Sequence, residues 1–313
     1  MKKLFALLLV LVLVAALGTG LAEEKKFIIG MSQCNLGEPW RVAMNDQIAA
    51  AAKDYPMFEI IWADAAQDNS KQIADIENFM QMGVDLIITS PNEATPLTDV
   101  VKRVYEAGIP IILLDRKIDG DTYTQFIGAD NVYIGRVCGE YVADVLLPDG
   151  GKICEIEGLA GTSGGIERDQ GFREGIAKNP KLEIIAHNNA DWLREKAITV
   201  AEEMLQAHDE IDLFFCLNDP MAEGAYIAAK NAGREGDILF VGVDGLPTPD
   251  GGIRSVMAGR LSLSMVYPTG GREAIESAYK LLVEGEELEK IVTLGTEVVD
   301  PEHAEELLAK YGG

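Results

Sequence analysis

Short apolar runs alternate along the chain with longer segments in which apolar residues recur at helical spacing. Such runs are typical of strands buried on both faces of a sheet, and the segments between them are long enough for helices. The predicted strands cover residues 27–33, 58–63, 85–90, 110–116, 125–130, 152–157, 182–187, 213–217, 238–244, 262–267 and 293–299. The clearest predicted helices cover residues 41–53, 71–82, 132–147, 194–206 and 221–232. This regular alternation predicts an α/β fold with parallel sheets and helices on both faces.

The strand pattern of the first half of the chain returns in the second half. The run from Pro110 to Asp115 matches the run from Ile238 to Asp244, and each ends in an aspartate. Two doubly wound, Rossmann-like lobes are therefore predicted rather than one large sheet. We expect a first lobe of residues 23–130 plus about 266–292, and a second lobe of residues 131–265 plus about 293–313. Three crossings between the lobes would form a hinge.

The first 22 residues have the composition of a secretory signal peptide. Two lysines follow Met1, an unbroken apolar run extends from Leu4 to Leu17, and small residues precede Glu23. The run is too short to span a membrane comfortably. The first cysteine is Cys34, so a lipid anchor at the cleavage point is not expected. The sequence therefore predicts an exported, periplasmic protein without a stable membrane anchor.

Acidic residues dominate the charge of the chain. The 51 acidic and 27 basic residues give a formal net charge of −24 at pH 7. This charge repels nucleic acids and anionic lipids, and no nucleic-acid partner is expected. No cofactor is predicted either, since neither a G-x-G-x-x-G nor a Walker motif occurs. The four cysteines lack metal-ligand spacing, and their pairing is left open by the sequence.

Charged and aromatic residues gather where predicted strands end. Asp115 and Arg116 are the last two residues of the predicted strand 110–116, at the edge where open α/β sheets bind ligands. The other candidates at such positions are Glu38, Trp40, Arg41, Arg168, Trp192, Asn218 and Asp244. Carboxylates accept and guanidinium groups donate hydrogen bonds, so together they satisfy hydroxyl groups, while aromatic faces pack on C–H groups. These residues predict a site for a small polyhydroxy ligand, and three carboxylates against three arginines favour a neutral one.

Two further features allow other interpretations. The segment Gly161–Gly165 matches G-x-S-x-G, which would make Ser163 the nucleophile of a secreted hydrolase. However, three residues separate the motif from the preceding strand, and a triad would require one of only three histidines. Asp219 precedes Pro220 at the start of a predicted helix, and we expect it to cap that helix.

With these residues together, the chain resembles the type I periplasmic solute-binding proteins of the ribose- and galactofuranose-binding type, over essentially all of the chain after the signal. The resemblance implies two α/β lobes with a three-strand hinge and no enzymatic activity. It implies a monomer that delivers a monosaccharide to an inner-membrane ABC transporter permease. The nine candidate residues fall on that family's ligand contacts. Ribose-type members carry a polar hinge residue before the proline, where this chain has Ser264–Pro268, so the resemblance implies a lost polar contact and argues against ribose.

Two related functions share such a pocket. A sensor would present the bound sugar to a chemoreceptor or a histidine kinase. A transcriptional repressor would carry a DNA-binding segment before the first strand, where this chain has only the predicted signal.

Overall fold

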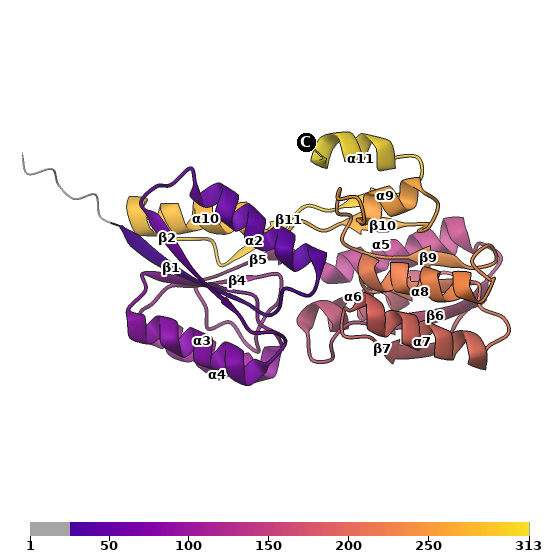
Figure 1. Ribbon diagram of the computed structural model, residues 1–313, viewed down its shortest axis with the longest axis horizontal. Helices are drawn as coiled ribbons and strands as arrows, with labels where there is room; N and C mark the ends of the chain where they lie inside the picture. The colour runs from indigo at the N-terminus through magenta and orange to yellow at the C-terminus, as the bar shows by residue number, and fades with distance from the viewer. Residues whose placement is uncertain (1–25, 313) are drawn as a thin grey trace, which may run out of the picture.

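The structure is a computed structural model that describes residues 26–312 (Figure 1). The predicted signal peptide lies outside the described residues. Within residues 26–312, no helix combines the length and the apolar character needed to cross a membrane.

The first lobe is built on a six-stranded parallel sheet with the strand order β11-β5-β4-β3-β1-β2. Its strands are β1 (Phe27–Gln33), β2 (Phe58–Asp64), β3 (Leu86–Thr89), β4 (Ile111–Leu114), β5 (Gln125–Ala129) and β11 (Ile291–Leu294). One face carries the helices α2 (Pro39–Ala52) and α10 (Gly271–Tyr279), the latter extended by η2 (Lys280–Glu284). The other face carries α3 (Asn69–Met82) and α4 (Ala94–Glu106), as Figure 1 shows. The four residues of β4 are apolar and buried because helices cover both faces.

The second lobe has a four-stranded parallel sheet with the order β7-β6-β8-β9. Its strands are β6 (Gly151–Glu157), β7 (Leu182–Asn189), β8 (Leu213–Cys216) and β9 (Leu239–Val241). The helices are α5 (Asn131–Tyr141), extended by η1 (Val142–Leu146), α6 (Ser163–Ile176), α7 (Arg194–Ala207), α8 (Asp219–Asn231), α9 (Gly252–Met257) and α11 (Ala304–Tyr311). Two short strands, β10 (Ser264–Val266) and β12 (Glu297–Val299), form an antiparallel pair beside this sheet. The predicted α/β fold with parallel sheets is confirmed.

The prediction of one continuous final strand over residues 293–299 is wrong. The segment forms two strands, since β11 pairs with β5 in the first sheet and β12 pairs with β10 beside the second. A chain that leaves one sheet for another must break its hydrogen-bond ladder, and Gly295 and Thr296 lie at that break. Residues 293 and 294 thus pair with the first sheet, and we move the proposed lobe boundary from about 293 to 295.

Helices α5 and α6 pack at very short range through glycines on both helices. A β-carbon at Gly135 would lie 2.1 Å from the carbonyl oxygen of Arg168, and one at Gly171 would lie 2.1 Å from that of Val132. Gly139 and Gly175 face the partner helix in the same way. The backbones touch because no side chain separates them. We call Gly135, Gly139, Gly171 and Gly175 the glycine contact.

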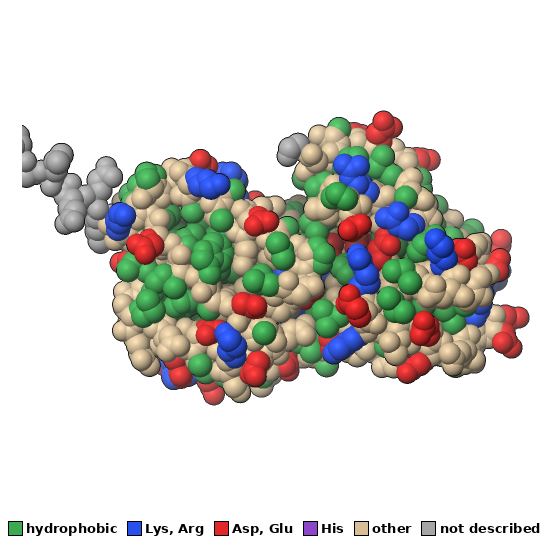
Figure 2. Space-filling model, in the orientation of Figure 1, with side chains coloured by type: hydrophobic (Ala, Val, Ile, Leu, Met, Phe, Trp, Pro, Cys, Tyr) green, Lys and Arg blue, Asp and Glu red, His purple; other side chains and the backbone are tan. Residues whose placement is uncertain are grey.

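All four cysteines are buried and free of disulfide bonds in the described chain. Buried thiols behave as small apolar side chains, and burial raises the pKa of Cys138 and of Cys154 to about 12. On the outside, Figure 2 shows acidic side chains scattered over both lobes with basic ones between them.

Candidate functional site

The loop after β1 and the first turn of α2 place three of the predicted residues at the cleft between the lobes. Pro39 opens α2, a position that suits its fixed φ, and Glu38 precedes it. Glu38, Trp40 and Arg41 are each no more than 5% exposed. The Asn35 side chain donates to the Glu38 carboxylate over 2.9 Å and so holds it in place.

The end of β4 places Asp115 beside two arginines. Its φ of 64° turns the backbone out of the sheet, which is why β4 stops at Leu114 and not at Arg116. Arg41 Nη2 donates to Asp115 Oδ2 over 2.6 Å, and Arg116 Nε lies 3.8 Å from the same oxygen. Burial raises the pKa of Asp115, but Arg41, Arg116 and the Tyr267 hydroxyl together lower it by more. The pKa of Asp115 is therefore below the usual value. Asp115 is therefore an ionised acceptor at neutral pH.

The second lobe contributes an arginine and a tryptophan to the site, Arg168 near the start of α6 and Trp192 just before α7. Arg168, in the second turn of α6, donates from Nε to the Asn131 side chain (2.8 Å) and from Nη1 to the Leu217 carbonyl (2.6 Å). Its guanidinium lies 5.5 Å from the Trp192 ring, within cation–π range. Asn218 caps α8 through its side-chain oxygen and donates to the Trp192 carbonyl over 3.1 Å. Most hydrogen-bonding capacity of Asn218 is thus used to position its neighbours.

Asp244 follows β9 in a strained turn with a φ of 144°. Among residues 26–312, no group donates a hydrogen bond to its carboxylate, although the residue is only 6% exposed. Burial and the neighbouring Asp219 raise the pKa of Asp244 well above the usual value, while Arg168 acts in the opposite direction. An acidic group without a partner is thereby available to a ligand.

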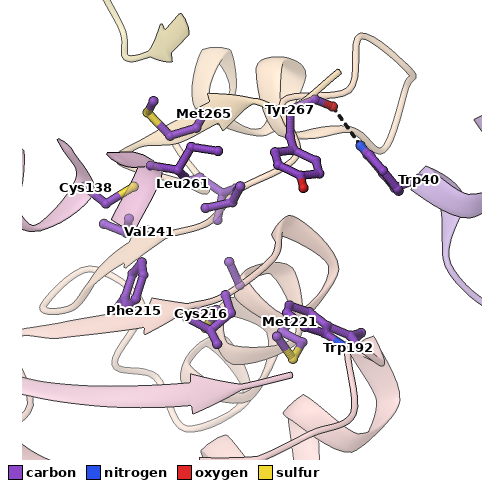
Figure 3. Close-up of a cluster of buried hydrophobic side chains, with 14 of the residues drawn as sticks. Trp40, Cys138, Trp192, Phe215, Cys216, Met221, Val241, Leu261, Met265 and Tyr267 are labelled. Carbon is purple, nitrogen blue, oxygen red and sulfur yellow. Dashed lines mark hydrogen bonds between the residues drawn. The ribbon is translucent and has the colours of Figure 1, made fainter. Parts of the chain in front are cut away.

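Tyr267 is the site residue that the sequence interpretation missed. Its hydroxyl donates to Asp115 Oδ1 over 2.6 Å, and its carbonyl accepts from the Trp40 indole over 2.8 Å (Figure 3). The Arg168 guanidinium lies 4.5 Å from its ring. The expected loss of a polar contact before Pro268 is therefore wrong, because a tyrosine hydroxyl reaches the site from there. The only signal was the X-Pro step at the end of a predicted strand.

Replacing Tyr267 by phenylalanine is expected to lower the free energy of unfolding by about 1.5 kcal/mol, because a buried hydrogen bond to a carboxylate is lost. Chemical denaturation measures the change. Tyr311→Phe is the matched control, since its hydroxyl contacts Glu297 on the surface, and a change within about 0.5 kcal/mol is expected there. Equal losses in both variants would contradict a special role for Tyr267.

All of the predicted residues line a single cavity. The lining residues are Glu38, Trp40, Arg41, Asp115, Arg116, Gly164, Arg168, Trp192, Asn218, Asp244 and Tyr267. Their role as ligand contacts stays a prediction.

Several polar atoms of the lining residues have no partner within the described chain. Arg41 Nε, Arg116 Nη2 and Trp192 Nε1 are buried donors without an acceptor. The Asp244 carboxylate, in the second lobe, is available as an acceptor. Buried polar groups are rarely left unpaired in folded proteins. A ligand with several hydroxyl groups, each a donor and an acceptor, would satisfy them.

Hydrogen bonds across the cleft join the two lobes at its rim. The backbone N–H of Lys117 donates to the Ser163 hydroxyl over 2.9 Å, and its ammonium group donates to Glu167 over 2.6 Å. The Ala94 N–H donates to the Gly161 carbonyl over 3.1 Å. Each contact joins the first lobe to the second, so the structure is the closed form of a two-lobed cleft.

The same contacts bear on the hydrolase alternative. Ser163 opens α6, and its oxygen accepts the Lys117 N–H. Within residues 26–312, no histidine is hydrogen-bonded to Ser163, and His187 and His303 pair with Glu157 and Asp300. The described residues also contain no group of three or more metal-ligating side chains. The G-x-S-x-G segment forms a turn and the start of α6 at the cleft rim.

Comparison with known proteins gives the family. The model of the periplasmic binding protein domain matches residues 29–287. The chain belongs to this family of periplasmic binding proteins. The ribose import binding protein of Escherichia coli K12 is 30% identical over 284 residues, which are 90% of this chain and 93% of the relative. The galactofuranose-binding protein of the same organism is 29% identical over 312 residues, 97% of each chain.

A solved structure is also similar to this periplasmic binding protein. The fructose-binding periplasmic domain of a hybrid two-component system is 42% identical, with a TM-score of 0.87, and the alignment covers 91% of this chain and 94% of that one. These relatives are binding proteins, which confirms the predicted class and the expectation that the chain is not an enzyme.

Proposed function

We propose that this protein captures a neutral monosaccharide between its lobes and delivers it to an ABC transporter. The observation that carries the proposal is the cavity in which buried arginines and carboxylates from both lobes face one space. The sugar would be galactofuranose-like or a related pentose or hexose. The relatives named for ribose, galactofuranose and fructose support that range. The nine predicted residues and Tyr267 would be its contacts.

The proposed mechanism is hinge closure. A sugar that contacts Asp115 in the first lobe and Arg168 in the second stabilises the closed form by its higher affinity for that form. The rim contacts of Lys117 with Ser163 and Glu167 form in the same state. A permease in the inner membrane would then receive the closed protein, which we propose to act as a periplasmic monomer, exported by its signal peptide and without a membrane anchor or cofactor.

The charge of the cavity favours a neutral sugar. Arg41, Arg116 and Arg168 face Glu38, Asp115 and Asp244. Burial and the neighbouring Asp219 raise the pKa of Asp244 well above the usual value, so the two carboxyl groups together favour holding one proton. Three positive charges then face three negative ones. A sugar phosphate would add charge that the cavity leaves unbalanced.

Sensing is a second candidate function. The similar solved structure of 42% identity is the sugar-binding domain of a two-component system, and its fold covers most of this chain. Sugar uptake in cells that lack this protein separates the two candidates. Lost uptake supports delivery, whereas intact uptake with lost sugar-induced gene expression supports sensing.

A thermal-shift panel tests the proposed ligand class. The panel contains D-ribose, D-galactose, L-arabinose, D-xylose and D-fructose, with D-ribose 5-phosphate and D-galactose 6-phosphate as charged controls. A sugar at 100 times its dissociation constant is expected to stabilise the protein by about 2.7 kcal/mol. The phosphates should shift the unfolding midpoint less than their parent sugars. No shift with any neutral sugar, or a larger shift with a phosphate, would overturn the proposal.

A further inference from the structure

A second buried carboxylate lies directly behind Asp244. Asp219 is the first residue of α8, is 3% exposed and does not line the cavity. Its Oδ2 accepts the Gly245 N–H over 2.8 Å, and its Oδ1 accepts the Ser264 hydroxyl over 2.7 Å. Its own N–H donates to the Val243 carbonyl over 2.7 Å. Asp219 therefore holds both neighbours of Asp244 as well as β10. We call β10 the hinge strand, because the chain passes from it to α10 in the first lobe. The prediction that it caps α8 is wrong, because the Asn218 side chain does so.

The packing around Asp219 leaves room for its carboxylate and little else. A β-carbon at Gly242 would lie 2.3 Å from Asp219 Oδ1, and one at Gly252 would lie 1.9 Å from Oδ2. Two glycines thus provide the space that this carboxylate fills.

The turn that carries Asp244 is joined to the hinge. The Asp244 N–H donates to the Met265 carbonyl over 3.1 Å, and the Asp244 carbonyl accepts the Tyr267 N–H over 3.0 Å. The next residue, Gly245, has a φ of 56°, and a β-carbon there would lie 2.7 Å from the Val266 Cα. A strained turn packed this closely persists only when its surroundings hold it. Asp219 is the group that bonds to the turn and to β10 at once.

We propose that Asp219 is a positioning residue that fixes the Asp244 turn to the hinge strand, so that Asp244 and Tyr267 enter the cavity in a defined arrangement. Asp219 acts through these two residues and does not contact the ligand itself. The geometric part of the proposal, that Asp219 fixes the Asp244 turn to β10, concerns the sugar-free protein. Only the expected change in sugar affinity rests on the proposed function.

The electrostatics show that Asp219 lowers stability at neutral pH. Burial raises its pKa to about 6, and Glu223 acts in the same direction, whereas Ser264, the Gly245 N–H and Arg168 lower it. The other titratable groups that Asp219 influences are Asp244, Cys138 and Cys216. Between about pH 4 and pH 6 the unfolded chain releases this proton before the folded chain does, so rising pH lowers the free energy of unfolding.

Hydrogen exchange in the sugar-free protein tests the geometric part. In Asp219→Ala, the amides of Gly245 and Tyr267 are expected to exchange at least ten times faster. In Asp219→Asn, exchange should rise no more than threefold, since the amide oxygen can accept the Gly245 N–H and the NH₂ group can donate to Ser264. Glu223→Gln is the matched control: it alters a buried carboxylate on the same helix that accepts from Ser255 and Arg260, away from the turn. No change at these amides in Asp219→Ala, or the same change in Glu223→Gln, would overturn the proposal.

Two further measurements separate positioning from a structural role. Calorimetric titration uses the neutral sugar with the largest thermal shift in the panel above. Asp219→Ala should weaken its binding at least tenfold, Asp219→Asn about threefold and Glu223→Gln not at all. The decline in unfolding free energy between pH 4 and pH 6 should be smaller in Asp219→Asn than in the wild type. Unchanged affinity in a folded Asp219→Ala variant would overturn the role in positioning. If no panel sugar binds the wild type, the proposed function fails while the exchange result still decides the geometric part.

Discussion

Replacing Gly135 by alanine is expected to lower the free energy of unfolding by about 3 kcal/mol. The new β-carbon would lie 2.1 Å from the Arg168 carbonyl oxygen and 2.8 Å from the Phe172 nitrogen, and both are backbone atoms that cannot rotate away. The helices α5 and α6 must separate to make room for it. Overpacking of this kind typically lowers the free energy of unfolding by about 1–3 kcal/mol, and occasionally by more. Alanine favours a helix over glycine by about 1 kcal/mol, which does not offset that loss. Chemical denaturation measures the change.

Gly236→Ala is the matched control for the glycine contact. A β-carbon there would have nothing within 4 Å, and the backbone does not need a positive φ. Its unfolding free energy should stay unchanged or rise by about 0.4–1 kcal/mol, because alanine restricts the unfolded chain. Since Arg168 donates to Asn131 across the same helix pair, Gly135→Ala should also weaken sugar binding. A Gly135→Ala variant as stable as the control would show that the two helices do not depend on this contact.

Replacing Asp115 by alanine is expected to weaken sugar binding by about 2 kcal/mol or more, which is roughly 30-fold in the dissociation constant. The carboxylate accepts from Arg41 and from Tyr267, and Arg116 lies within 3.8 Å of it. Without it, buried guanidinium charge and a tyrosine hydroxyl lose their acceptor, and the sugar loses an ionised one. Calorimetric titration with the panel sugar that binds best measures the loss.

Asp119→Ala separates this effect from a general loss of charge. Asp119, like Asp115, comes after β4. It is exposed and accepts a hydrogen bond from the Thr95 hydroxyl. We expect its removal to leave sugar affinity unchanged, because exposed groups away from the cavity contribute little. Unchanged affinity in a folded Asp115→Ala variant would remove Asp115 from the site.

The convergence of the predicted residues follows from the parallel sheets. Asp115, Asn218 and Asp244 come directly after the strands β4, β8 and β9 or within a few residues of them. The carboxyl ends of parallel strands share one edge of a sheet, so strand ends that are far apart in sequence meet there. Position relative to a predicted strand was therefore sufficient to find them.

Tyr267 and Asp219 show where such reasoning stops. Tyr267 reaches Asp115 across 152 residues of sequence, and its placement depends on where the hinge strand leaves the second lobe. Asp219 was interpreted as a helix cap from its local sequence, a role that Asn218 performs instead. Its partners Gly245 and Ser264 belong to other elements. No local pattern predicts which of two adjacent polar residues turns inward.

The amino-acid sequence by itself determined the α/β class, the repeat of two lobes and the strand ends that carry the cavity residues. Each of these depends on periodicity or on neighbouring residues, which a linear pattern contains. Only the tertiary structure decided that β11 and β12 are separate strands, that glycines bring α5 and α6 into contact, and that Tyr267 and Asp219 support Asp115 and Asp244. These features depend on which distant backbones approach one another, and that is settled only when the two lobes pack.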